Sequence, residues 1–249
     1  MASVLVARLT LMSIDNLKTS EQYLLNWPTN EKFAHANFLS SLSNEKAVKL
    51  IDQWPNWHRG NENFYALIIY GPTGCGKTHL SCVWGDISKA RKISLKQLVA
   101  HEFLESKNLV FILDDIDHYI VDPVIQEAFL HLYNWTREQG GYLLLTATKR
   151  PKEWGVSLKD LSSRLLSFET VQIKAPDDYL LRAVIIKQFY DLQITLSDDV
   201  LSYMVPRIER TFNGIRELVK NIDRLSRIEK KKISIGMVRE VLNLDNKGY

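Results

Sequence analysis

One apolar run that passes directly into a glycine-rich turn constrains the fold of this chain more than any other feature. The run at 66–70, Ala-Leu-Ile-Ile-Tyr, is apolar throughout, as expected for a strand that is buried on both faces of a sheet. It is followed by Gly-Pro-Thr-Gly-Cys-Gly-Lys-Thr at 71–78, and a helical pattern begins at His79. A strand, a G-x-x-x-x-G-K-T loop and a helix in this order predict a phosphate-binding loop rather than a chance glycine-rich turn.

The residues of this loop have separate tasks in binding a phosphate. The glycines allow backbone N–H groups to turn toward it, and the N-terminus of the following helix adds a partial positive charge. Lys77 supplies a full positive charge, and the hydroxyl of Thr78 is a ligand for Mg²⁺. The sequence therefore predicts a nucleotide site lined by Gly71, Pro72, Thr73, Gly74, Cys75, Gly76, Lys77 and Thr78.

A second apolar run, at 109–113, ends in the acidic pair Asp114-Asp115. Four apolar residues followed by two acids form a Walker B pattern, in which the first carboxylate lies at the carboxyl edge of a parallel strand. We expect Asp114 to hold Mg²⁺ through water, together with Thr78, and Asp115 to orient an attacking water as the catalytic base. A strand that ends in a solvated acidic turn is the alternative interpretation.

A third apolar run, at 142–145, ends in the polar cluster 146–151. Parallel strands present their carboxyl ends to one crevice, so a polar side chain here would lie beside the two acids. We expect only one of Thr146 and Thr148 to face the nucleotide, and turn capping is the alternative role for both. With a last strand at 170–173, these runs predict an α/β domain over 29–174 that contains a parallel sheet between two layers of helices.

The chain changes character near residue 175. From Asp177 onward the apolar spacing is entirely helical, which predicts a small all-α domain over 175–249. Pro206 is expected to shorten or kink one of its helices.

Composition excludes several classes of protein. The formal net charge of +3 is too mild to indicate a nucleic-acid-binding protein, and we expect no sequence-specific DNA binding. The two cysteines, Cys75 and Cys82, support neither a disulfide framework nor a zinc site and suit a cytoplasmic location. No apolar run approaches the length of a membrane span, and no membrane partner is expected. Residues 1–20 are predicted to form a disordered extension.

The motifs taken together resemble a known family. A phosphate loop, an acidic strand end, a polar strand end, an arginine in a short helix at 158–165 and a helical appendage follow the order of an AAA+ module. Individual segments are similar to those of the bacterial replication initiator DnaA and cover about 21–243: Phe38-Leu39-x-x-x-Ser43-Asn44-x-x-Ala47, Gly76–Leu80, Asp114–Ile116, Lys149–Pro151, Ser163–Leu165 and Ile215–Leu218. The resemblance implies a P-loop AAA+ domain followed by a small helical lid domain.

The resemblance also implies roles for single residues. The bound ligand would be ATP or ADP with Mg²⁺, and His79 would belong to the nucleotide site. Arg164 resembles an arginine finger, which reaches the γ-phosphate held by a neighbouring subunit, and Arg216 resembles the sensor arginine of the lid. Thr148 stands where the initiators have an aspartate, and Asp115 is shorter than the usual glutamate, which predicts slow intrinsic turnover.

Within the family, the chain looks like the Hda-type regulators, because no DNA-reading domain is expected after the module. The segment Gln22, Tyr23, Leu24 and Leu25, within 21–28, resembles the glutamine-led motif that docks on the DNA polymerase III sliding clamp (beta subunit). The resemblance implies a regulator that stimulates hydrolysis of DnaA-bound ATP, with DnaA and the clamp as partners and with homo-oligomers also allowed. A nucleotide-gated adaptor that recruits DnaA without hydrolysis, and a helicase loader of the DnaC type, are the alternatives.

Overall fold

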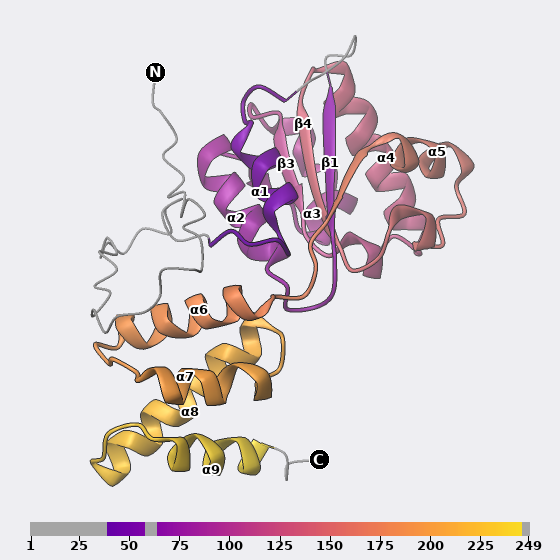
Figure 1. The fold of residues 1–249 in the computed structure, drawn as a ribbon. Coiled ribbons are helices and arrows are strands. Elements are labelled where there is room, and N and C mark those ends of the chain that lie inside the picture. The colour runs from indigo at the N-terminus through magenta and orange to yellow at the C-terminus, as the bar shows by residue number, and fades with distance from the viewer. Residues whose placement is uncertain (1–38, 58–63, 246–249) are drawn as a thin grey trace. The chain divides into compact units, whose positions relative to one another are not determined.

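The sheet explains how distant segments of the chain reach one site. The computed structural model describes residues 39–57 and 64–245, so the clamp-motif segment 21–28 and the expected extension at 1–20 lie outside the described residues. Five strands form one sheet in the order β2-β3-β4-β1-β5, and every paired neighbour is parallel. Figure 1 labels β3, β4 and β1, which lie side by side in this order. The predicted α/β fold with a parallel sheet is confirmed.

The elements follow one another closely along the chain. The strands are β1 (Tyr65–Tyr70), β2 (Arg91–Lys92), β3 (Val110–Leu113), β4 (Tyr142–Ala147) and β5 (Glu169–Gln172). The helices are α1 (Glu45–Asp52), α2 (Lys77–Ser88), α3 (Leu95–Val99), α4 (Pro123–Glu138), α5 (Lys159–Ser167), α6 (Asp178–Asp191), α7 (Asp198–Met204), α8 (Phe212–Glu229) and α9 (Ile235–Asp245).

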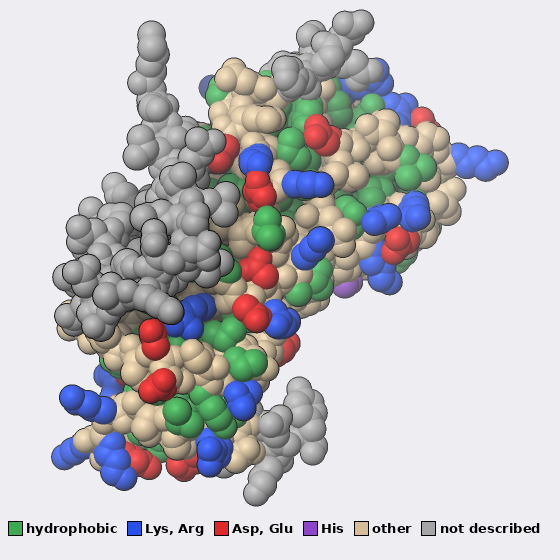
Figure 2. Space-filling view, viewed as in Figure 1, with side chains coloured by type: hydrophobic (Ala, Val, Ile, Leu, Met, Phe, Trp, Pro, Cys, Tyr) green, Lys and Arg blue, Asp and Glu red, His purple; other side chains and the backbone are tan. Residues whose placement is uncertain are grey.

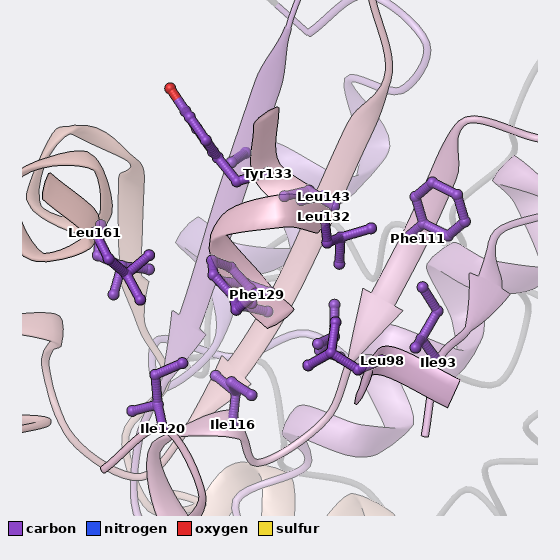
Figure 3. Close-up of a cluster of buried hydrophobic side chains, with 14 of the residues drawn as sticks. Ile93, Leu98, Phe111, Ile116, Ile120, Phe129, Leu132, Tyr133, Leu143 and Leu161 are labelled. Carbon is purple, nitrogen blue, oxygen red and sulfur yellow. The ribbon is translucent and has the colours of Figure 1, made fainter. Parts of the chain in front are cut away.

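Alternate strand residues pack on opposite faces of the sheet and create its two helical layers. Phe111 of β3 and Leu143 of β4 join one core cluster with Leu98 of α3 and Phe129 of α4, as Figure 3 shows. Successive side chains of a strand point to opposite faces, so the neighbouring positions meet helix α2. A Cβ on Gly85 of α2 would lie 3.0 Å from Ile112, which places this helix directly over β3.

A cluster of aromatic rings fills the α2 side near the start of β1. Trp57 and Trp84 are stacked with ring centroids 5.0 Å apart, and Trp54 meets Tyr142 edge to face at 4.6 Å. Such pairs add about 0.5–1.5 kcal/mol each beyond the area that they bury. This cluster attaches the segment after α1 to the sheet and to the helix that follows the phosphate loop.

The segment 91–108 begins with the short strand β2 and does not continue as one helix. Helix α3 ends at Val99, His101 adopts a left-handed backbone with φ 56°, and a short 3-10 helix follows at Glu102–Glu105. Leu98 and Phe103 are both fully buried in the same core cluster. Five residues along one α-helix would place them about 140° apart, so the break at His101 is what allows both side chains to reach this core.

Helices α6 to α9 enclose a second core cluster, made of residues between Leu181 and Val241. Asp177 caps α6 by accepting a hydrogen bond from the backbone of Leu180, and Thr211 caps α8 in the same way through Gly214. Helix α7 ends at Met204, just before Pro206, as predicted.

The surface adds two observations. On the face drawn in Figure 2, Lys and Arg side chains are interspersed with Asp and Glu side chains, so the described residues of this face form no continuous basic track. None of the helices in the described part of the chain is long and apolar enough to cross a membrane.

Candidate functional site

The glycine-rich loop joins the end of β1 to the start of α2. Gly74 and Gly76 have φ values of 75° and 98°, which favour glycine because a Cβ is strained there. Lys77, only 5% exposed, donates hydrogen bonds to the carbonyl oxygens of Gly71 (2.9 Å) and Pro72 (3.1 Å). The lysine ammonium is thus held inside the loop by two carbonyl oxygens. The oxygens of a bound phosphate would be stronger acceptors for it than these carbonyls.

Asp114 is the polar centre of the site. Its Oδ1 accepts hydrogen bonds from Thr146 Oγ1 (2.5 Å) and Thr78 Oγ1 (3.3 Å), and its Oδ2 accepts one from Lys92 Nζ (2.9 Å). Burial raises the pKa of Asp114, but the hydrogen bonds from Thr146, Lys92 and Thr78 outweigh burial and hold the pKa below its usual value. Asp114 is therefore ionised at neutral pH.

Thr78 and Asp114 together suit a magnesium ion. Their oxygen atoms lie 3.3 Å apart, so an ion held by the Thr78 hydroxyl would have the Asp114 carboxylate within reach of one of its waters. Over the described ranges, no group of three His, Cys, Asp or Glu side chains is placed to hold a metal. A hydroxyl and a carboxylate fit an ion that completes its shell with water and substrate phosphates, as Mg²⁺ does.

Asp115 begins a sharp turn directly after β3. Its φ of 50° is left-handed, and its backbone N–H donates to Thr146 Oγ1 at 2.8 Å. The turn sends the chain into a short 3-10 helix at Ile116–His118 and leaves the Asp115 side chain half-buried. The role of Asp115 as catalytic base stays a prediction.

The two threonines at the end of β4 have different partners. Thr146 is fully buried and bridges Asp114 and the backbone of Asp115, whereas Thr148 donates its hydroxyl to Asp117 at 2.5 Å. Residues two apart share a face only while a strand continues, and β4 ends at Ala147. Thr146 is therefore the threonine beside the acidic pair, and a role of Thr148 in nucleotide binding stays a prediction.

Two further residues of this region were missed at the level of sequence. Lys92 comes from the two-residue strand β2, and no motif marks it. Asp117 receives Thr148 Oγ1 and two backbone N–H groups, including that of Lys149 at 3.2 Å. Only its position three residues after Asp114 could have indicated it.

The start of α8 lies against the phosphate loop. The backbone N–H of Phe212 donates to the carbonyl of Gly74 at 2.9 Å, and a Cβ on Gly76 would lie 2.8 Å from the Phe212 ring. Arg216, one turn further along, is close enough to His79 to affect it. Burial lowers the pKa of His79, and the positive charges of Arg216 and Lys187 lower it further, although the residue keeps exposed surface. The predicted lid arginine is thus near enough to the predicted loop histidine for its charge to act there.

Arg164 lies on α5, and its guanidinium hydrogen-bonds to a residue of the same helix. Its Nε and Nη2 donate to the two oxygens of Asp160, at 3.0 and 2.8 Å. Its guanidinium carbon is 4.7 Å from the centroid of the Tyr133 ring, and its side chain is 25% exposed. Asp160 and the Tyr133 ring therefore hold the arginine in a defined position.

A parallel sheet in this order, a glycine-rich loop between β1 and α2, an acidic pair after β3 and a helical region after the sheet define a P-loop module of the AAA+ class. The family model described as "Hda, lid domain" matches residues 181–242. The chain belongs to the DnaA/Hda family of AAA+ proteins.

The sequence relatives cover most of the chain. It is 28% identical over 250 residues to the chromosomal replication initiator protein DnaA of Buchnera aphidicola, an alignment of 91% of the chain. The chain spans only 56% of that initiator's length. It is 30% identical over 190 residues to an uncharacterized protein of Haemophilus influenzae, covering 71% of the chain and 80% of that protein.

Solved structures share the fold. Domain III of DnaA from Thermotoga maritima matches with a TM-score of 0.70 at 19% identity, over 87% of the chain and 98% of that domain. AMPPCP-bound DnaA from Aquifex aeolicus matches with a TM-score of 0.64 at 21% identity, over 81% of the chain and 70% of that protein.

Proposed function

We propose that this chain is a regulator of replication initiation that presents Arg164 to ATP bound by a DnaA initiator and stimulates its hydrolysis. The observation that carries the proposal is the setting of Arg164, which Asp160 and the Tyr133 ring hold on a short helix of an AAA+ module. A guanidinium supplied in trans neutralises the charge that develops on the transferred phosphoryl oxygens, and such a finger is worth about 10³–10⁵ in rate.

The chain's own loop would bind ATP or ADP with Mg²⁺. Lys77 and the N-terminus of α2 supply positive charge, and Thr78 with Asp114 supplies oxygen ligands for the metal. When bound, the metal would neutralise phosphate charge. Arg216 would bridge the lid to the nucleotide, an assignment supported by its proximity to His79. AMPPCP in the Aquifex aeolicus relative supports an adenine nucleotide here.

The chain would reach the initiator at replicating DNA by docking on the sliding clamp through Gln22–Leu25. These residues lie outside the described part of the chain, so the support is the resemblance of the segment to clamp-binding peptides. Docking at the clamp would limit hydrolysis of initiator-bound ATP to places where DNA has already begun to replicate. A second initiation would thereby be prevented.

One observation favours a second candidate, a nucleotide-gated adaptor that recruits the initiator without hydrolysis. Both oxygens of Asp160 already hold Arg164, so its charge is partly neutralised within the chain. The Asp160 side chain is 54% exposed, however, and ion pairs that solvent reaches contribute only about 0–1 kcal/mol. A γ-phosphate at an interface can therefore share the guanidinium with Asp160, and the regulator is the better supported function.

The two candidates differ in what happens to the initiator's nucleotide. Initiator loaded with radiolabelled ATP is mixed with clamp-loaded DNA and this chain, and both co-precipitation and the ATP to ADP ratio are measured. Regulation predicts conversion to ADP, whereas an adaptor would leave the co-precipitated ATP intact. Clamp binding is measured separately with Gln22→Ala, with Gln53→Ala, an exposed glutamine at the end of α1, as the matched control. Equal clamp affinity of the two variants would show that Gln22 does not take part in docking on the clamp.

A further inference from the structure

A lysine side chain approaches the carboxylate that is expected to hold the metal. Lys92 Nζ lies 2.9 Å from Asp114 Oδ2, while Oδ1 of the same carboxylate is engaged by Thr146 and Thr78. The side chain of Asp114 is 13% exposed and that of Lys92 is 54% exposed. The ammonium therefore meets the carboxylate from its solvent side, and both carboxylate oxygens have partners within the chain.

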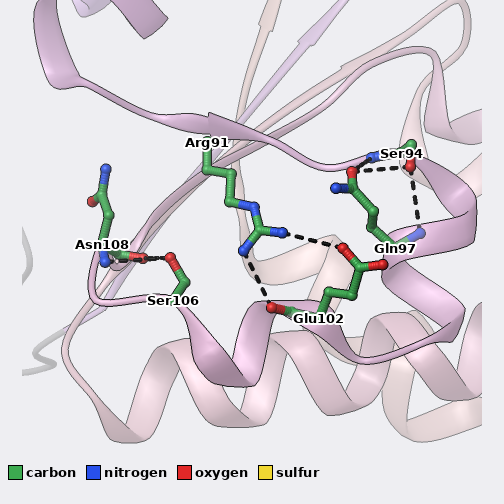
Figure 4. A network of polar contacts seen from close by, with 6 residues as sticks. All are labelled: Arg91, Ser94, Gln97, Glu102, Ser106 and Asn108. Atoms are coloured by element: carbon green, nitrogen blue, oxygen red, sulfur yellow. Dashed lines mark hydrogen bonds and ion pairs between the residues drawn. The ribbon is translucent and has the colours of Figure 1, made fainter.

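The strand that carries Lys92 is fixed on both sides of it. Arg91 donates to the backbone oxygen and the carboxylate of Glu102, and Ser94 caps α3 in a reciprocal pair with Gln97 (Figure 4). The backbone N–H of Ile93 donates to the carbonyl of Ile112 at 2.9 Å, which continues the parallel pairing of β2 with β3. These contacts place the Cα of Lys92 beside the end of β3, so the ion pair does not depend on a flexible loop.

Charge decides what this ion pair does to a nucleotide. A bare carboxylate next to a phosphate site repels the phosphates, and a divalent cation normally removes that repulsion. An ammonium in contact with Asp114 removes part of it without a metal. The same ammonium already uses the negative charge of the carboxylate whose other oxygen, Oδ1, lies beside Thr78, and its exposure makes this a competition with the metal rather than a block.

We propose that Lys92 competes with Mg²⁺ for Asp114, so that this chain binds its nucleotide with little dependence on Mg²⁺. The inference rests on the nucleotide site of the proposed function, but it does not involve Arg164, the initiator or the clamp.

The test compares nucleotide affinity with and without metal. A fluorescent ADP analogue is titrated into the full chain in EDTA and in millimolar Mg²⁺, for the wild type, Lys92→Ala and Lys96→Ala. Lys96 is an exposed lysine of α3, so its substitution removes the same charge from a neighbouring element. Circular dichroism and melting curves check that each variant is folded.

The wild type and Lys96→Ala are expected to bind the analogue no more than about threefold more weakly in EDTA than in Mg²⁺. In Lys92→Ala this ratio should rise to about tenfold or more, and the Mg²⁺ concentration for half-maximal binding should fall about three- to tenfold. Equal ratios in Lys92→Ala and the wild type would overturn the inference and leave the nucleotide site standing. Failure of folded wild type to bind the analogue in either buffer would overturn the nucleotide site itself, and this inference with it.

Discussion

Asp160 holds Arg164 through two parallel hydrogen bonds, from Nε at 3.0 Å and from Nη2 at 2.8 Å. The two residues are four apart on α5, so one helical turn aligns them. A fork of this kind fixes the plane of the guanidinium as well as its position.

Asp160→Ala should therefore weaken the finger without removing it. An exposed pair contributes at most about 1 kcal/mol, which corresponds to about a fivefold loss in the rate of initiator ATP hydrolysis. The saturating rate should fall, while the concentration for half-maximal stimulation and the melting temperature change little. A large rise in that concentration with an unchanged rate would instead assign Asp160 to partner binding.

Thr146→Val should disturb the acidic strand end more than Thr148→Val. The first change removes the hydroxyl that donates to Asp114 and accepts from the backbone of Asp115, and leaving a buried donor unpaired costs about 1–3 kcal/mol. Chemical denaturation measures this cost, and nucleotide titrations with Mg²⁺ measure its effect on the site. Thr148→Val is the control on the same strand end, because its hydroxyl contacts Asp117. Equal effects of both on nucleotide binding would contradict the placement of Thr146 as the residue beside the acids.

Gly74→Ala should weaken both the loop and its contact with α8. The φ of 75° is strained for alanine, and the new Cβ would meet the Thr211 Cβ at 2.6 Å. Left-handed backbone alone costs about 1–2 kcal/mol. Gly236→Ala is the matched control, since its Cβ would have room in helix α9 and alanine favours a helix. Melting temperatures are measured with and without ADP, and only Gly74→Ala should show a smaller ADP-induced rise than the wild type. A full rise in Gly74→Ala would show that the loop tolerates the change.

The pKa of His79 reports whether Arg216 lies at the loop. Burial lowers this pKa, and Arg216 and Lys187 lower it further. Between the folded pKa and the unfolded value near 6.5, the unfolded chain binds more protons, so this histidine makes stability rise with pH in that window. Arg216→Gln should raise the His79 pKa and flatten this dependence. NMR titration of the imidazole measures the His79 pKa directly. An unchanged pKa in Arg216→Gln would place Arg216 away from the loop.

The fold could be predicted where local chemistry and burial agree. The run into Gly71–Thr78 and the helical spacing from Asp177 onward each carry their own structural signal, and the structure has both as expected. The break at His101 could not be seen, because two core residues demand it through their positions in the folded chain. The contact of Lys92 with Asp114 joins residues 22 apart across two neighbouring strands. A pairing of that kind is fixed by sheet order, which no local pattern contains.

The most direct test of the proposed function is the single-turnover hydrolysis of radiolabelled ATP preloaded on the initiator, with clamp-loaded DNA present. The wild type is compared with Arg164→Ala, with Arg164→Lys, and with Lys159→Ala, which removes an exposed positive charge from the same helix. We predict that Arg164→Ala stimulates hydrolysis at least about a hundredfold less than the wild type. Arg164→Lys should restore little of this rate because lysine lacks the planar fork, and Lys159→Ala should behave as the wild type. Stimulation by Arg164→Ala equal to that of the wild type would contradict the account.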